Sequence, residues 1–289
     1  MPDLNVQQNN ANIIKAFKVA LETSHRNLLD NAYFVGGGSQ LGGYKFPINQ
    51  IGETTYTTVG QTIDRWDLYG GSVSVEADGV VVTASPDWGQ SIPIERIPAG
   101  TYTASVLTAS GDFGSITFTT NETQKFVNGQ LVTGVNLNFI DRWTTTKTLF
   151  SLQAQGVKLA AAKLEKGTVS TLLNDPVPNY QKTLADCQLF YERIKATSNN
   201  HTLAIGIGNA SALYAPLKIA PKYSTPVVSA SAIYCGQASE SIIATGLSIF
   251  DADNKTGQYS LQVDGTFTAN TPYRIILPLT AFVQFVVNF

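Results

Sequence analysis

The sequence predicts a mainly β protein in which one N-terminal helix precedes two domains built as β-sandwiches. Three observations predict this fold class. Helical spacing of apolar residues is clear only before residue 26, short segments of alternating apolar and polar residues fill the rest, and Gly-containing turn dipeptides separate them. Many short antiparallel strands with few helices between them are typical of a β-sandwich.

The first segment, residues 1–26, is predicted to hold a helix from about Asn5 to Ser24. Its apolar residues recur at three- and four-residue spacing and form one stripe, which consists of Ile13, Phe17, Ala20 and Leu21. A helix with a stripe of roughly two to three turns is marginally stable alone in water. We therefore expect it to pack on its own domain, or to serve as a trimer stem or as a plug into a larger assembly.

Strand signals begin near Asn27, and turn signals divide them. Asp78-Gly79, Asn128-Gly129 and Asp264-Gly265 each lie between β-forming residues. A two-residue hairpin turn needs positive φ at both central positions, which these residue pairs tolerate. Residues Ile97–Thr120 add two alternating strands joined by a Gly-containing turn. We expect hairpins at all four places.

The segment Asn174–Gln181 marks a domain boundary, because its two prolines stiffen the chain and break any strand ladder. We expect one β-sandwich over residues 27–175 and a C-terminal β domain over residues 176–289. Residues 182–196 fit either a helical turn or a strand. Residues 273–289 are more apolar than one exposed sheet face requires, so we expect another sheet or another subunit to cover them.

Composition excludes several classes of function. The net charge is −2 and no basic cluster occurs, so a nucleic acid partner is not expected. No apolar segment approaches the ~20 residues that span a bilayer, and no signal peptide is recognisable at the N-terminus. Charged residues make up 14% of the chain, against ~25% in average domains, which suits an extracellular or virion β protein. Cys187 and Cys235 are expected to be buried free thiols.

Five blocks of sequence carry a resemblance. They are NLLDNAYF (27–34), INQIGETTYTTVGQTIDRW (48–66), AAAKLEKGTVSTLL (160–173), YQKTLADCQLFYERI (180–194) and LYAPLKIAPKYSTPVVSAS (213–231). In content and order these blocks resemble the appendage and tail-fibre-like proteins of tailed bacteriophages and prophages. The resemblance covers about a third of the positions, spread along most of the chain.

The resemblance implies a homotrimeric virion appendage, assembled in the cytoplasm of the bacterial host. Residues 1–26 would attach to other virion proteins, residues 27–175 would form a carbohydrate-binding-module-like jelly roll, and residues 176–289 would form a trimerisation or tip domain. A bacterial surface glycan would be the further partner. No cofactor is expected. Jelly-roll modules often hold a structural Ca²⁺, but Asp251–Gln262 departs from a calcium loop at Lys255 and Gln262.

One tetrapeptide, Ile-Asp-Arg-Trp, occurs twice, at residues 63–66 and 140–143. A tryptophan beside an acid can form a sugar platform, because the ring stacks on the apolar face of a pyranose while the carboxylate accepts hydroxyl hydrogen bonds. The alternative is structural: Trp66 would cap the core, and Asp64 would pair with an arginine or a backbone donor. On that interpretation both copies brace the margins of one sandwich.

The candidate carbohydrate-binding residues are Trp88, Asp87, Tyr69 and Trp143. Ser85–Ser91 follows a strong strand signal and contains turn-forming residues, so it is predicted to be a loop that presents Trp88. Tyr69, which precedes two glycines, would extend the same surface. The alternative for Trp88 is burial under a neighbouring loop or subunit.

We do not expect an enzyme. His25 and His201 are the two histidines, and neither belongs to a recognisable nucleophile–base motif. The expected function is adhesion to bacterial surface glycans through weak sites multiplied by copy number. One alternative is a head-fibre, capsid or baseplate decoration protein without a ligand. A second is a polysaccharide depolymerase, which would need two carboxylates ~5–10 Å apart.

Overall fold

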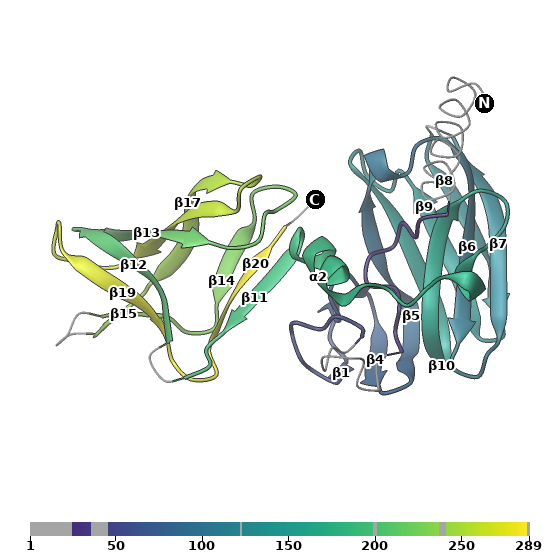
Figure 1. Ribbon diagram of the computed structural model, residues 1–289, viewed down its shortest axis with the longest axis horizontal. Helices are drawn as coiled ribbons and strands as arrows, with labels where there is room; N and C mark the ends of the chain where they lie inside the picture. Colours follow the sequence, from purple (N-terminus) through teal and green to yellow (C-terminus); the bar gives the residue numbers. More distant parts are fainter. Residues whose placement is uncertain (1–24, 36–45, 122, 199–200, 237–240, 288–289) are drawn as a thin grey trace, which may run out of the picture. The chain divides into compact units, whose positions relative to one another are not determined.

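A computed structural model describes residues 25–35, 46–121, 123–198, 201–236 and 241–287. Within these ranges the chain is mainly β, with strands β1–β20 and a single α-helix, which confirms the prediction of a mainly β protein. The chain divides into two compact units, residues 1–180 and 181–289 (Figure 1). The predicted N-terminal helix lies outside the described residues. No helix in the described ranges is long and apolar enough to cross a membrane.

The first unit contains ten strands joined in one sheet. They are β1 (Thr55–Tyr56), β2 (Gly60–Gln61), β3 (Asp67–Leu68), β4 (Gly71–Glu76), β5 (Gly79–Pro93), β6 (Gly100–Thr108), β7 (Phe113–Thr120), β8 (Lys125–Val132), β9 (Val135–Asp141) and β10 (Lys147–Lys166). Two short 3-10 helices, Ile94–Arg96 and Leu172–Asn174, follow β5 and β10.

Two long strands make this sheet curl into two layers. β5 has 15 residues and β10 has 20. The two strands pair with each other, and the strand on the opposite side of each one changes along its length. β10 pairs with β5 over Lys147–Leu159 and with β9 over Leu149–Ala154, and it pairs with β6 over Leu159–Lys166. β5 pairs with β4 at its start and with β3 near Gly89. The layers meet where Phe118 of β7 packs on Phe139 of β9, with ring centroids 4.6 Å apart.

The core of the first unit is built around aromatic rings. Trp66 stacks on Trp88 with centroids 4.1 Å apart, and Phe34 packs edge-on against Trp66 at 5.3 Å. All three rings are fully buried. Side chains of this size bury ~150–250 Å² each and dominate the energetics of a core. The block at residues 27–34 therefore contributes directly to the core.

The same block contributes a buried polar network. Asp30 pairs with Arg65 at 3.1 Å and with Arg96 at 2.9 Å. Burial alone would raise the pKa of Asp30, but the charges and hydrogen bonds of the two arginines outweigh it and lower the pKa. The Asn31 amide donates to the carbonyl oxygens of Ile48 and Asp64 and accepts from the Ile48 N–H. Polar groups that the core buries are thereby satisfied.

The four predicted hairpins have mixed outcomes. The turn at Asp78-Gly79 joins β4 to β5, and the Gly-containing turn in Ile97–Thr120 joins β6 to β7, so both are confirmed. The prediction at Asn128-Gly129 is wrong, because both residues lie inside β8 and the turn comes at Gly134, where φ is 77°. A Cβ on Gly129 would lie 2.7 Å from Ile116 Cδ1, so Gly129 packs closely against Ile116.

The prediction at Asp264-Gly265 is also wrong. Asp264 ends β18, and the next strand, β19, pairs with β12 and β15 instead of returning along β18. Turn dipeptides show where a strand can stop, but the direction in which the chain leaves is decided by the sheet it joins.

The second unit has one helix, α2 (Tyr180–Gln188), and two sheets (Figure 1). The three-stranded sheet has the order β11 (Tyr191–Lys195), β20 (Phe282–Val286) and β14 (Val227–Ala230). The seven-stranded sheet has the order β16 (Ser241–Ile243), β15 (Tyr234–Gly236), β19 (Pro272–Leu277), β12 (His201–Asn209), β13 (Ala212–Lys218), β18 (Gln258–Asp264) and β17 (Gly246–Asp253). Residues 182–196 thus hold both a helix and a strand.

One core joins the two sheets of the second unit. Ile275 and Leu277 of β19 and Phe285 of β20 belong to different sheets and lie in the same cluster of buried residues. The apolar C-terminal segment is therefore covered by a second sheet of its own chain. Cys187 and Cys235 are buried free thiols, as predicted.

Candidate functional site

The two copies of Ile-Asp-Arg-Trp adopt the same unusual backbone. Arg65 and Arg142 both have positive φ, 74° and 50°. This left-handed conformation is uncommon for a residue other than glycine and marks a tight turn. The aspartate of each copy, Asp64 or Asp141, is fully buried. The copies differ in the tryptophan, because Trp66 is fully buried whereas Trp143 is 37% exposed.

The prediction that Ser85–Ser91 forms a loop is wrong. These residues lie in β5, where Trp88 pairs with Leu152 and the register against β10 is irregular before Trp88. The next pair is Ala84 with Ala154, so β5 has more residues than β10 between these two pairs. A bulge is one of the few places where a strand tolerates proline. Turn-forming residues therefore marked a bulge at this position.

Trp88 does not present a surface for a ligand. Its ring is fully buried against Trp66, and its Nε1 donates a hydrogen bond to Thr62 Oγ1 at 2.9 Å. A sugar would have to displace the core to reach the ring. Of the two interpretations of Trp88, burial describes the structure, although the cover is its own core and not a neighbouring loop or subunit.

The other three candidate residues come together. Tyr69, just after β3, donates its backbone N–H to the carbonyl oxygen of Asp87 at 2.9 Å. The ring of Tyr69 packs edge-on against Trp143, with centroids 6.4 Å apart and an interplanar angle of 87°. Lys147 places its Nζ 5.4 Å from the centroid of the Trp143 ring. We call Tyr69, Asp87, Asn138, Trp143 and Lys147 the Trp143 face.

The polar part of the Trp143 face centres on the Asp87 carboxyl. Asn138 Nδ2 donates to Asp87 Oδ2 at 3.1 Å. Asp87 Oδ1 is buried and meets no donor at full hydrogen-bond geometry among the described residues. Burial raises the pKa of the Asp87 carboxyl, although hydrogen bonding from Asn138, Gln153 and Ser151 opposes the shift.

Neighbouring ionisable groups influence one another on this face. Burial raises the pKa of Asp67, against the opposing charges of Arg65 and Lys147. Burial also raises the pKa of Tyr69 to about 12, with a further contribution from the negative charges of Asp67 and Asp87. The phenol of Tyr69 is therefore a neutral hydrogen-bond donor at physiological pH.

Amide side chains extend the face across neighbouring strands. In cross-strand register, Asn128 of β8 lies beside Asn138 of β9, while Asn136 lies between Gln130 of β8 and Gln153 of β10. Cross-strand partners share one face of a sheet. Leu137 and Phe139, which alternate with the asparagines, are buried in the core. This alternation, visible in the sequence VNLNFI (135–140), was the signal that could have found Asn136 and Asn138.

An exposed indole beside amides, a phenol and a carboxylate can bind a polyhydroxylated ligand. The ring provides an apolar surface for C–H groups, and the polar side chains accept and donate hydrogen bonds. No group of three or more His, Cys, Asp or Glu side chains that could hold a metal ion is found in the part of the chain that the structure describes. Asp251–Gln262, compared above with a calcium loop, forms the β17–β18 hairpin. No family model, curated protein or solved structure matches this chain.

Proposed function

We propose that this protein is a non-enzymatic virion appendage that adheres to bacterial surface glycans, with the Trp143 face as a binding surface. The observation that carries the proposal is the exposed indole of Trp143, which contacts the ring of Tyr69 and the ammonium group of Lys147. A rigid ring loses little conformational entropy when it stacks on a sugar. The five blocks that resemble phage appendage proteins support the virion setting.

The finer fold assignment belongs to the same proposal. A carbohydrate-binding-module-like jelly roll over residues 27–175 is supported by a sheet that curls where β10 changes its partners from β5 and β9 to β6. A C-terminal β-sandwich over residues 176–289 is supported by two sheets on one core. Residues 1–26 would attach the chain to other virion proteins.

We further propose that the protein associates as a homotrimer, because weak glycan sites gain avidity when several copies are linked. Exposed apolar side chains in the second unit, among them Ile205 and Ile207 of β12 and Val227 of β14, support association. Sedimentation of the full chain at micromolar concentration should give three times the protomer mass. A stable, well-dispersed single protomer would contradict this part of the proposal.

A glycan array with the full chain and Trp143→Ala tests the adhesive surface. We expect the wild type to bind a subset of bacterial glycans and Trp143→Ala to lose that binding. Phe113→Ala is the matched control, because Phe113 is exposed to a similar degree, at 39% against 37% for Trp143, and starts β7, which contributes no residue to the Trp143 face. Equal binding by wild type and Trp143→Ala would exclude the Trp143 face, and no binding by the wild type would favour a purely structural decoration protein.

One observation favours the second alternative, a polysaccharide depolymerase. Asp67 and Asp87 both have raised pKa values, and the negative charge of each raises the pKa of Tyr69. Glycosidases use a carboxyl with a raised pKa as their general acid. Release of reducing ends from bacterial polysaccharide by the wild type, and its loss in Asp87→Asn, would establish hydrolysis and contradict the non-enzymatic proposal.

A further inference from the structure

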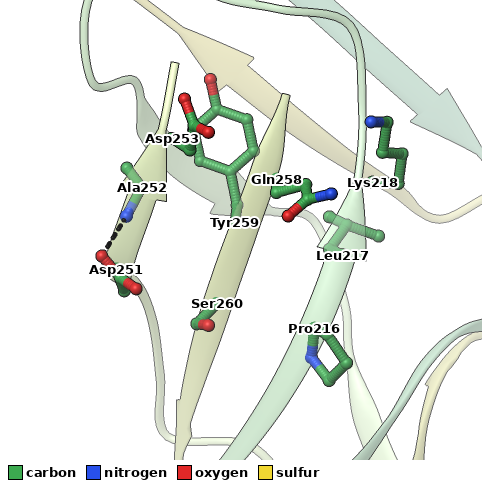
Figure 2. A pocket seen from close by; sticks show the side chains of 9 residues that line it. All are labelled: Pro216, Leu217, Lys218, Asp251, Ala252, Asp253, Gln258, Tyr259 and Ser260. Carbon is green, nitrogen blue, oxygen red and sulfur yellow. Dashed lines mark hydrogen bonds between the residues drawn. The ribbon is translucent and has the colours of Figure 1, made fainter. Parts of the chain in front are cut away.

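A second surface with aromatic and polar groups lies in the C-terminal unit. It is a shallow depression of about 560 Å³ across β13, β18 and β17, which are adjacent strands (Figure 2). Volumes of ~300–1,000 Å³ are typical of ligand sites. Each strand contributes three consecutive residues: Pro216–Lys218, Gln258–Ser260 and Asp251–Asp253.

Strand alternation determines which of these side chains can meet a ligand. Leu217, Ala252 and Tyr259 pack on the core of the unit. The residues between them face the opposite side of the sheet, because successive side chains in a strand alternate. They form two cross-strand rows, which are Asp253, Gln258 and Lys218 in one and Asp251, Ser260 and Pro216 in the other. The floor of the depression is therefore polar.

A bulge adds an aromatic rim. The register between β17 and β18 shifts between Ile249 and Asp251, so Phe250 is the extra residue. Phe250 and Asp251 are consequently both exposed, although they are consecutive. Phe250 is 66% exposed and packs edge-on against Tyr214, with centroids 5.0 Å apart. Tyr214 lies two residues before Pro216 on β13, hence on the same face. The bulge thus places an aromatic ring beside a carboxylate.

Several polar groups in the depression have no protein partner. The side chains of Lys218, Gln258 and Ser260 make no hydrogen bond to any other described residue. Asp251 accepts one bond at Oδ1, from the N–H of Ala252 at 2.9 Å. Asp253, by contrast, is engaged in its own turn, where it accepts from Thr256 Oγ1 at 2.6 Å and from two backbone N–H groups. Groups on all three strands therefore remain available to a ligand.

We propose that this depression binds an uncharged pyranose unit of a glycan, with Phe250 on the apolar face of the ring and Asp251, Gln258 and Lys218 on its hydroxyl groups. An aromatic ring beside mixed donors and acceptors matches a ligand that has one C–H face and a rim of hydroxyls. Two carboxylates and one ammonium group line the depression, which disfavours an anionic sugar.

The site is separate from the Trp143 face, which lies in the other unit. The inference that its glycan comes from a bacterial surface rests on the proposed function. The inference that the depression binds a sugar does not. Adhesion through two units of one chain would also change the avidity, since each copy would contribute two contacts to the same polysaccharide.

The test is an NMR titration of the full chain with methyl glucoside, methyl galactoside, methyl mannoside and N-acetylglucosamine, with glucuronic acid as the anionic comparison. We expect saturable shifts of backbone amides in β13, β17 and β18 with at least one neutral sugar, and weaker shifts with glucuronic acid. Phe250→Ala should abolish the response, and Asp251→Asn should weaken affinity about tenfold. Leu279→Ala is the control, because Leu279 is an exposed apolar residue outside the depression.

Two outcomes would overturn the proposal. One is the absence of saturable shifts in β13, β17 and β18 with every neutral sugar of the panel, and the other is an unchanged response in Phe250→Ala. Trp143→Ala separates this proposal from the proposed function. If the Trp143 face fails on the array while the response in β17 and β18 persists, only the function assigned to the first unit is wrong.

Discussion

The two copies of Ile-Asp-Arg-Trp share a backbone conformation and a buried aspartate, but their tryptophan side chains differ in how deeply they are buried. Both arginines have positive φ. Trp66 stacks on Trp88 in the core, whereas Trp143 lies partly in solvent against Tyr69 and Lys147. The tetrapeptide thus specifies a turn, and the surrounding elements decide what the turn displays.

The charged residues of the two copies differ in the same way. Arg65 reaches across to Asp30 and to the carbonyl oxygen of Ser91, so it joins three segments of the chain. Arg142 pairs with Asp141, the residue immediately before it. The first copy therefore connects distant parts of the fold. In the second copy the arginine pairs with the aspartate of the same turn, and the tryptophan is partly exposed.

The largest expected difference concerns the tryptophans. Trp66→Ala should lower the free energy of unfolding by about 3–5 kcal/mol, because it leaves a cavity beside Trp88. Trp143→Ala should lower it by about 1 kcal/mol or less, as for most surface changes. Urea unfolding followed by tryptophan fluorescence measures both, since all three tryptophans lie in the first unit. Equal losses would mean that the two turns have the same structural role.

A smaller difference is expected between the arginines. Arg65→Ala should lower the free energy of unfolding by about 2–3 kcal/mol, because the buried Asp30 would keep only Arg96 as its charged partner. Arg142→Ala should have an effect of about 1 kcal/mol, since the side chain of Arg142 is 19% exposed against 6% for that of Arg65. The same urea assay applies. A larger loss in Arg142→Ala would reverse the comparison.

A third expected effect is a pH dependence at the first copy. Burial raises the pKa of Asp64 to about 6, although hydrogen bonds from Gln50 oppose the shift. The folded state therefore holds this proton more tightly than the unfolded state, where the pKa is 3.8, and the stability it provides is lost as pH rises from about 4 to 6.

The Asp64→Asn variant has no ionisable group at this position, so it should not lose stability in this way as pH rises from about 4 to 6. Relative to wild type, its free energy of unfolding should rise by about 1–3 kcal/mol between pH 4 and pH 7. Unfolding at both pH values measures this difference. A constant offset between the two proteins across this range would show that Asp64 does not titrate as described.

The sequence predicted the mainly β content and the division into two β-rich units, because alternation and scarce helical periodicity are properties of the chain itself. It did not predict which strands pair. Asn128-Gly129 reads as a turn by local propensity, but the glycine fits a close approach to Ile116 inside β8. Close packing of this kind depends on residues that are distant in sequence.

The candidate site was predicted in part. Tyr69, Asp87 and Trp143 were named from the sequence and lie together, whereas Trp88 was misplaced because proline and glycine signalled a loop where β5 has a bulge. Lys147 was missed, because its position over Trp143 arises from the turn between β9 and β10. The depression at Phe250 was missed for a similar reason, since one extra residue in a strand reverses the face to which a side chain points.

The continuity of β10 from its pairing with β5 and β9 to its pairing with β6 has a consequence for how the first unit comes apart. Neither layer can open alone, because each would have to break hydrogen bonds along β10, which the other layer also uses. Amide protons of the two layers should then exchange with solvent in one concerted event instead of in separate stages. The first unit would then resist local opening until it unfolds as a whole.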